Sequence, residues 1–248
     1  MKKFGLIGHP IAHSLSPALF KAAYDGKYAY DLIEGEDFET SYRRFIEEYD
    51  AINVTAPFKE AAFAKADILS EECASTGATN LLVKTPEGIK AYNSDFLGVR
   101  MWLSEVTEDL KGVKILIVGL GGAGKAAAAA AESLGMDVIR MNRTVRDSQT
   151  HPLDDFRKCF RKANIIIYNI PAAIPELKDL TDSDFNEDKP KLILEANYKD
   201  PSLRETMESF GSKAVYTGGE TWLLYQAMTG YEILTGEKPD LTKMSDVL

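Results

Sequence analysis

Short apolar runs alternate with amphipathic segments along most of the chain, and this alternation predicts an α/β protein. Runs rich in apolar and β-branched residues predict strands at 4–8, 28–33, 51–54, 113–118, 137–141, 165–168, 192–195 and 214–216. Helical spacing predicts helices at 16–24, 38–49, 94–106, 123–134 and 221–234, and a further helix whose first residue is Pro57. Segments 79–84 and 89–92 flank Thr85-Pro-Glu-Gly88, which predicts a hairpin inside an otherwise mostly parallel arrangement.

A glycine-rich motif follows the strand predicted at 113–118. The residues Gly119-Leu-Gly121-Gly122-Ala123-Gly124 carry G-x-G-x-x-G between a strand and a helix. The first glycine permits a tight turn, the second lets the backbone approach a pyrophosphate, and the third lets the helix pack on the strand. The helix N-terminus then supplies N–H groups to the phosphates. The motif predicts a dinucleotide site, with an ordinary glycine-rich turn as the alternative.

The end of the next strand indicates which dinucleotide is bound. An NAD-binding fold usually carries an acidic residue there for the ribose 2′-hydroxyl. This chain carries Asn142-Arg143-Thr144-Val-Arg146 instead, and a planar guanidinium suits a 2′-phosphate. The sequence therefore favours NADP(H) over NAD(H), although Asp147 follows closely and could weaken that preference.

Lys59 is the candidate for proton transfer. It falls in the first turn of a predicted helix, where the helix dipole disfavours a cation. Either Lys59 is a solvated surface lysine, or it is held there because it exchanges a proton. Nicotinamide chemistry on an alcohol requires a group that takes up the hydroxyl proton, which favours the second interpretation. Asp95 is the candidate partner, although an acidic residue in a first helical turn is also an ordinary complement to the dipole.

Other polar residues have two interpretations each. Ser14 and Ser16 could face one ligand, or they could be a turn residue and an N-cap. Gln226 lies four residues after Trp222 on a predicted helix, and its amide could reach a hydroxyl or be exposed.

Composition limits the kinds of binding partner and cellular location that we expect. The formal net charge is −9 and the chain has no long basic run, so we expect no nucleic-acid partner. Two cysteines and three histidines, widely spaced, are too few for a zinc cluster, so we expect no metal. The N-terminus does not have the pattern of a signal peptide, and the longest apolar stretch, 113–131, contains glycines and Lys125. We therefore expect a cytoplasmic protein that does not span a membrane.

Several motifs, in order along most of the chain, resemble the shikimate dehydrogenase family. They are Gly8-His-Pro-Ile-Ala-His-Ser-Leu-Ser-Pro17, Asn53-Val-Thr-Ala-Pro-Phe-Lys59, Gly77-Ala-Thr-Asn80, Asn93-Ser-Asp95, Gly119–Gly124 and Asn142-Arg-Thr144. The resemblance implies reversible, NADP-dependent reduction of 3-dehydroshikimate to shikimate, with Lys59 and Asp95 as an acid–base dyad. It further implies that the small-molecule substrate is held by Ser14, Ser16, Thr55, Asn80, Tyr198 and Gln226. The implied cofactor-binding positions are Gly119, Gly121, Gly122, Ala123, Gly124, Asn142, Arg143, Thr144, Arg146 and Gly219.

The implied fold has two α/β lobes. Residues 1–96, completed by 219–248, form a substrate-binding domain, and residues 97–218 form a Rossmann-like NADP-binding domain. The oligomeric state is left open between monomer and homodimer.

The chain departs from the family pattern at Phe20, where a histidine is usual, and at Glu195, where an aspartate is usual. Further departures are Asn169-Ile170-Pro171 in place of Asn-Ala-Thr, and Thr221 and Trp222 in the usual Gly-x-Gly-Met segment. Three of these changes lie where the family contacts cofactor, so cofactor affinity and nicotinamide placement are left open. Two alternatives remain: a quinate/shikimate-type dehydrogenase of different specificity, and a catalytically weak NADP(H)-binding sensor.

Overall fold

The computed structural model describes residues 2–248 and divides into two compact units. The first unit contains the chain up to Gly98 together with Leu224–Leu248, and the second is Val99–Leu223. Both divisions fall inside helices, namely α5 (Ser94–Val106) and α9 (Gly219–Thr235). The assignment of one unit to substrate and the other to NADP stays a prediction.

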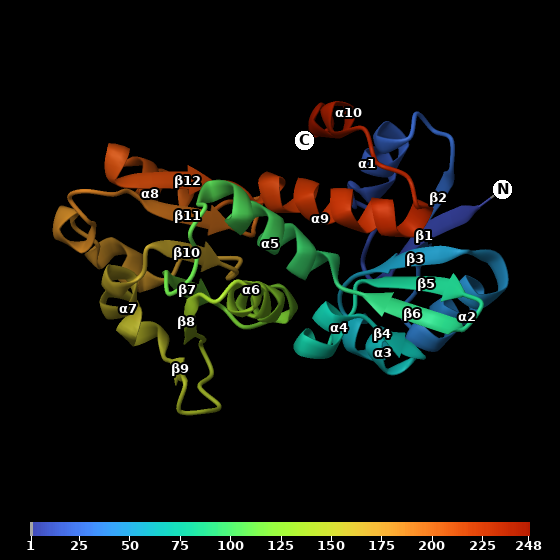
Figure 1. Ribbon diagram of the computed structural model, residues 1–248, viewed down its shortest axis with the longest axis horizontal. Helices are drawn as coiled ribbons and strands as arrows, with labels where there is room; N and C mark the ends of the chain where they lie inside the picture. Colours follow the sequence, from blue (N-terminus) through green and yellow to red (C-terminus); the bar gives the residue numbers. More distant parts are fainter. Residues whose placement is uncertain (1) are drawn as a thin grey trace. The chain divides into compact units, whose positions relative to one another are not determined.

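The first unit is built on one mixed sheet (Figure 1). Its strands lie in the order β2 (Ala29–Glu34), β1 (Lys3–Gly8), β3 (Ala51–Val54), β5 (Leu81–Thr85), β6 (Gly88–Tyr92) and β4 (Ile68–Leu69). Strand β5 runs antiparallel to both of its neighbours, whereas the other pairs are parallel. The predicted hairpin is therefore confirmed as β5 and β6, and its first strand begins two residues later than expected.

Helices cover both faces of this sheet. Figure 1 shows α2 (Phe38–Glu48), α3 (Lys59–Ala64) and α4 (Glu71–Thr76) below it, and α1 (Ser16–Ala23) and α10 (Leu241–Ser245) above it. On the α2 face, Phe45, Ala62 and Cys73 pack against Ile7 and Ile52 in one hydrophobic cluster. The apolar stripe of each helix thus accounts for the layered arrangement.

The helix that carries Lys59 begins later than predicted. Pro57 is not its first residue: the helix starts at Lys59, and Phe58 is the N-cap. The Phe58 N–H donates to the Thr55 carbonyl at 3.0 Å, so residues 55–58 close a turn before the first helical hydrogen bond, from Ala62 N–H to Phe58 O. The prediction that Lys59 lies in the first helical turn is confirmed.

The second unit is a parallel sheet in the strand order of a dinucleotide-binding fold. Its strands lie in the order β12 (Ala214–Thr217), β11 (Lys191–Glu195), β10 (Ile165–Tyr168), β7 (Lys114–Val118), β8 (Asp137–Met141) and β9 (Thr150–His151). Every strand pair is parallel. The chain starts in the middle of the sheet at β7, builds outward to β9, and then crosses to β10 on the other side of β7. The order therefore reverses between β7 and β10, which is where such sheets bind ligands.

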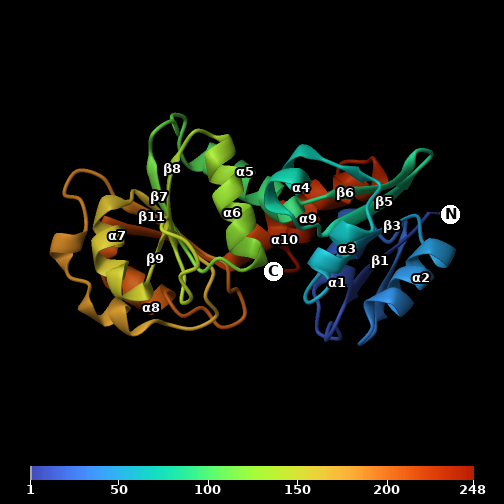
Figure 2. The same ribbon diagram turned by 90° about the horizontal axis from the view of Figure 1, so that it is seen from below.

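Two views agree on the layers of the second unit. Helix α6 (Gly122–Ser133) covers one face of the sheet, and α7 (Phe156–Lys162) and α8 (Arg204–Glu208) cover the other (Figure 2). Phe156, Phe160 and Met207 pack against Leu116 and Ile166 in the core beneath α7 and α8. The remaining elements are short 3₁₀ turns at Leu153–Asp155, Pro175–Asp179, Asp182–Asp184 and Gly211–Lys213. The predicted two-domain α/β class is confirmed.

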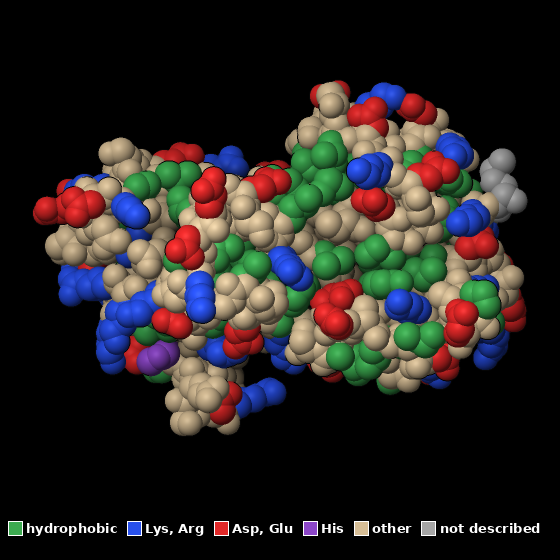
Figure 3. Space-filling view, viewed as in Figure 1, with side chains coloured by type: hydrophobic (Ala, Val, Ile, Leu, Met, Phe, Trp, Pro, Cys, Tyr) green, Lys and Arg blue, Asp and Glu red, His purple; other side chains and the backbone are tan. Residues whose placement is uncertain are grey.

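Among residues 2–248, no helix has the length and apolar character needed to cross a lipid bilayer. On the face drawn in Figure 3, lysine and arginine side chains are interspersed with aspartate and glutamate.

Candidate active site

The topology of the first unit brings four chain segments to one edge of its sheet. Strands β1, β3 and β6 end at this edge, and the antiparallel β5 begins there. The segments that follow or precede these strand ends carry four of the six predicted substrate residues and both predicted catalytic residues. They are Ser14 and Ser16 after β1, Thr55 and Lys59 after β3, Asn80 before β5, and Asp95 after β6.

Lys59 and Asp95 meet at this edge. The Lys59 Nζ donates a hydrogen bond to Asp95 Oδ2, and the two groups also form an ion pair. Both side chains are mostly buried, with 23% and 14% of their surfaces exposed. The Lys59 carbonyl accepts from the Thr79 N–H at 3.4 Å, which ties the helix start to the residue before Asn80. A charge-assisted pair that keeps some access to solvent can both hold and exchange a proton.

Ser94 joins two of the predicted substrate residues, and sequence reasoning missed it. Its N–H donates to Asn80 Oδ1 at 2.7 Å, and its hydroxyl accepts from Asn80 Nδ2 at 2.9 Å. The same hydroxyl donates to Gln226 Oε1 at 3.2 Å. This direction leaves the Gln226 amide nitrogen, a donor, available to a ligand hydroxyl.

Two glycines allow this contact between α5 and α9. A Cβ on Gly98 would lie 2.7 Å from Gln226 N, and a Cβ on Gly230 would lie 3.1 Å from Ser94 Oγ. The helix backbones approach closely because these positions lack side chains. Ser94 stands inside the Asn93-Ser-Asp95 motif, so its neighbours in the sequence were the signal that could have identified it.

The two serines after β1 lie together. Ser14 Oγ donates to Ser16 Oγ at 3.2 Å and accepts from the Ser16 N–H at the same distance. Ser16 is the first residue of α1, whose N-cap is Leu15 and has no side-chain cap, so neither serine is the N-cap. The two hydroxyls therefore lie in contact, with that of Ser14 donating to that of Ser16.

The glycine-rich segment of the second unit fits a dinucleotide. Gly119 has a φ of +88°, which an L-residue rarely adopts, and a Cβ on Gly124 would overlap the Gly119 carbonyl oxygen. These two glycines are required by the turn and the helix packing. Gly121 differs, because a Cβ there would meet nothing within 4 Å. The space over Gly121, at the N-terminus of α6, is the kind of cradle that a pyrophosphate fills.

The segment after β8 presents the predicted NADP determinants. Asn142 Oδ1 accepts from the Leu120 N–H at 3.3 Å, and Asn142 Nδ2 donates to the Thr144 carbonyl at 3.2 Å. Asn142 thus ties this segment to the glycine-rich loop. Arg143 and Arg146 are exposed and form no ion pair with any residue in 2–248. Both guanidinium groups are therefore able to bind an anion such as a phosphate.

The Asp147 carboxylate is engaged within its own turn. Its carboxylate accepts from Thr150 Oγ1 and from the Gln149 N–H, both at 2.9 Å. These hydrogen bonds lower the pKa of Asp147. One oxygen of this carboxylate therefore closes its own turn.

Tyr198 lies in the loop after β11, in the second unit. Burial raises the pKa of Tyr198, so its phenol stays protonated near neutral pH and is able to donate. Gly219, another predicted cofactor position, is closely packed against the same strand end: a Cβ there would lie 2.9 Å from Glu195 O.

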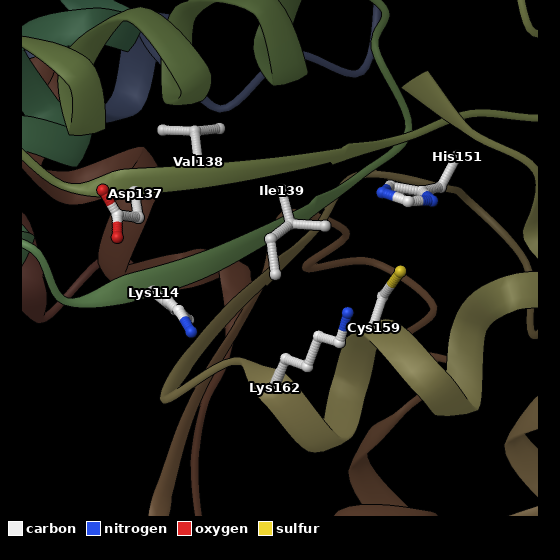
Figure 4. Close-up of a pocket in the computed structure, with 7 residues that line it drawn as sticks. All are labelled: Lys114, Asp137, Val138, Ile139, His151, Cys159 and Lys162. Atoms are coloured by element: carbon white, nitrogen blue, oxygen red, sulfur yellow. The ribbon is translucent and has the colours of Figure 1, made fainter. Parts of the chain in front are cut away.

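One pocket of the second unit lies away from these residues. It has a volume of about 390 Å³ and is lined by Lys114, Asp137, Val138, Ile139, His151, Cys159 and Lys162 (Figure 4). Lys114 and Asp137 are the first residues of β7 and β8, so the pocket is at the opposite sheet edge from the glycine-rich loop. It contains none of the predicted site residues. In the described part of the chain, no group of three or more metal-ligating side chains is gathered.

Comparison with known proteins decides the family. Residues 6–82 match the shikimate dehydrogenase substrate binding domain, and residues 88–194 match the D-isomer specific 2-hydroxyacid dehydrogenase NAD binding domain. The chain is 31% identical to the shikimate dehydrogenase (NADP⁺) of Staphylococcus aureus, over 98% of this chain and 96% of that protein. The chain belongs to the shikimate dehydrogenase family.

Two further relatives agree with that family. The shikimate dehydrogenase (NADP⁺) of Thermotoga maritima is 29% identical over 93% of this chain and 92% of its own length. A crystal structure of shikimate 5-dehydrogenase from Thermus thermophilus, in complex with NADP(H) and shikimate, has a TM-score of 0.80 and 26% identity. The match covers 100% of this chain and 98% of that chain.

The structure shows where three of the residues that depart from the family pattern lie. Phe20 is 1% exposed and packs among aromatic rings, with centroids 4.6 Å from Tyr30 and 4.8 Å from Tyr231. Ile170 is buried in the core of the second unit and lies against Gly119, and Trp222 is also buried. Each of these three apolar side chains is therefore buried in a packed interior.

Proposed function

We propose that the chain catalyses the reversible, NADP-dependent interconversion of 3-dehydroshikimate and shikimate. Family membership over nearly the full chain supports the reaction class. The observation that carries the proposal is the ion pair of Lys59 and Asp95, which lies at the sheet edge where the predicted substrate residues gather.

The second unit would hold NADP(H). The open backbone at Gly121 and the N-terminus of α6 would take the pyrophosphate, and Arg143 with Arg146 would take the 2′-phosphate. When bound, NADPH supplies the hydride equivalent that reduces the substrate ketone.

Lys59 supplies the proton, and Asp95 orients the Lys59 ammonium. As the ketone becomes a hydroxyl, its oxygen gains one proton, which the Lys59 ammonium donates. The neutral amine then recovers a proton from solvent, while the Asp95 carboxylate holds Nζ in place. In the oxidative direction the amine takes up the hydroxyl proton.

The remaining polar side chains orient the substrate. The hydroxyls of Ser16 and Tyr198 are donors suited to the substrate carboxylate, and the Ser14 hydroxyl can join them by rotating away from Ser16. The amides of Asn80 and Gln226 and the Thr55 hydroxyl suit the ring hydroxyls, and Ser94 fixes both amides in one orientation. Binding through several fixed donors holds the ring in one pose for reaction.

The test is absorbance at the NADPH band after protein is mixed with shikimate or quinate, each with NADP⁺ or NAD⁺. The proposal expects robust turnover only with shikimate and NADP⁺. Turnover with quinate or NAD⁺ would keep the dyad and overturn the specificity. No turnover, from folded protein that binds NADPH, would favour a ligand sensor. A cytoplasmic location and a monomeric or homodimeric state stay predictions.

A further inference from the structure

Glu195 is fully buried at the end of β11, and its carboxylate is engaged within the second unit. It accepts four hydrogen bonds. The Ser202 N–H and Ser202 hydroxyl donate to Oε1 at 2.6 Å and 2.9 Å, and the Leu203 N–H and Tyr216 hydroxyl donate to Oε2 at 3.1 Å and 2.7 Å. A buried carboxylate needs such donors, because leaving it unpaired is strongly unfavourable.

These hydrogen bonds join the two ends of one loop. The loop leaves β11 at Ala196 and returns at Ser202 and Leu203, which both donate to the carboxylate of Glu195. Inside the loop, Asn197 Oδ1 accepts from the Lys199 N–H at 3.3 Å and from the Asp200 N–H at 3.4 Å. Glu195 therefore closes the loop at its base, and Asn197 shapes its tip.

Tyr198 lies within this closed loop. The Ala196 N–H donates to the Tyr168 carbonyl at 2.8 Å, which fixes the outgoing end against β10. The returning end is held by the carboxylate of Glu195 and by Leu203, whose side chain is buried in the core of the second unit. Loss of the carboxylate contacts would loosen the loop on the Ser202 side of Tyr198.

The carboxylate of Glu195 also binds the neighbouring strand. Tyr216 comes from the neighbouring strand β12, whereas Ser202 comes from the loop, so one carboxylate spans two separate elements. The Arg204 guanidinium, at the start of α8, lies over the Tyr216 ring, 5.5 Å from its centroid.

We propose that Glu195 is a positioning residue for substrate binding, which acts by holding the loop 196–203 so that Tyr198 keeps one orientation. This inference rests on the proposed function, because the ligand of Tyr198 is the substrate carboxylate of that reaction. Glu195 touches neither substrate nor cofactor, and its effect passes through Tyr198.

The test is a double-mutant cycle on Glu195→Gln and Tyr198→Phe. Glutamine keeps the shape of glutamate but turns amide hydrogens toward groups that are themselves donors. Each single variant is expected to raise the KM for shikimate by about tenfold with kcat within about twofold, because a binding contact made equally in ground and transition states is lost. The double variant is expected to be no worse than the worse single variant, because both changes remove one interaction.

Two further variants serve as a fallback and as a control. Tyr216→Phe removes one of the four donors and is expected to raise KM by about twofold to threefold, and it serves if Glu195→Gln fails to fold. Glu187→Gln, at an exposed glutamate of the same unit, is the matched control and should match the wild type. Amide hydrogen exchange of residues 196–203 is expected to speed up in Glu195→Gln and not in Tyr198→Phe.

The outcomes separate this inference from the proposed function. If the wild type turns over shikimate and the two KM effects multiply in the double variant, or loop exchange is unchanged, the positioning role is wrong. If the wild type shows no turnover, the dissociation constant for shikimate is measured by calorimetry for the wild type and the three variants, and it replaces KM in the same cycle. Absence of both turnover and shikimate binding would overturn the proposed function and this inference with it.

Discussion

The Lys59 ammonium donates a hydrogen bond to the Asp95 carboxylate across 36 positions of sequence. The two residues follow strands β3 and β6, which end at the same sheet edge on either side of β5. Both belong to the first unit, so their pairing is a property of that unit's own fold. The helix dipole at Lys59 is unfavourable for its charge, and Asp95 compensates for it.

Arg143 and Arg146 are expected to set the cofactor preference. Changing both to glutamine removes the guanidinium groups available to the 2′-phosphate and should weaken NADPH binding by about tenfold to a hundredfold. NADH lacks that phosphate, so its affinity should change by less than about twofold. Fluorescence titration of both cofactors measures this. Lys162→Gln, at the opposite sheet edge, is the control. Equal losses for both cofactors would show that the arginines do not read the phosphate.

Gly121 and Gly124 should respond differently to alanine. Gly121→Ala meets nothing within 4 Å and keeps an allowed φ of −71°, so thermal stability should be retained while NADP(H) binding is lost. Gly124→Ala overlaps the Gly119 carbonyl and should cost about 1–3 kcal/mol of unfolding free energy. Thermal melts with and without NADPH separate the two effects. Tight NADPH binding by Gly121→Ala would contradict the assigned pyrophosphate position.

Asp184 should make stability depend on pH. Burial alone would raise its pKa, but hydrogen bonds from Arg157, the Thr181 N–H and Arg161 outweigh burial and hold the pKa well below its ordinary 3.8. A lowered folded-state pKa stabilises the fold above the unfolded pKa, and that contribution is lost as the pH falls. Asp184→Asn should therefore cost about 1–3 kcal/mol at pH 7.

The difference between wild type and Asp184→Asn should shrink as the pH falls below 3.8. Urea unfolding at pH 7, 5 and 3 measures it. Asp182→Asn in the same turn is the control, because the Asp182 side chain is 75% exposed and its ion pair with Lys213 should contribute under about 1 kcal/mol. A difference that stays constant with pH would mean that the charge of Asp184 is not what stabilises the fold.

Most of the long elements could be predicted from the sequence. The helix 94–106 and the strands 137–141 and 165–168 have the predicted bounds, because their apolar periodicity is strong and their ends carry clear turn signals. The short elements were missed, including β4 (Ile68–Leu69), β9 (Thr150–His151), α7 and α8. These are too short to show a period, and packing in the finished sheets defines them.

The site was only partly predictable for a related reason. Motifs place Lys59, Asp95 and Asn80 on particular loops, but the sequence alone does not state that three loops converge on one sheet edge. Ser94 was missed because its role depends on Gln226, 132 positions away, and on glycines that bring two helices together. Glu195 was noted only as a departure, since its four donors come from a loop and a later strand.

The most direct test of the account is the kcat of Lys59→Ala for shikimate oxidation with NADP⁺, beside Lys65→Ala. Lys65 ends the same helix and pairs with Glu39, so it controls for loss of a lysine from that helix. The account predicts that Lys59→Ala loses about 10²–10⁴-fold in kcat with shikimate KM within about threefold, and that Lys65→Ala matches the wild type. A Lys59→Ala rate equal to that of the wild type would contradict the proton-transfer role on which the account depends.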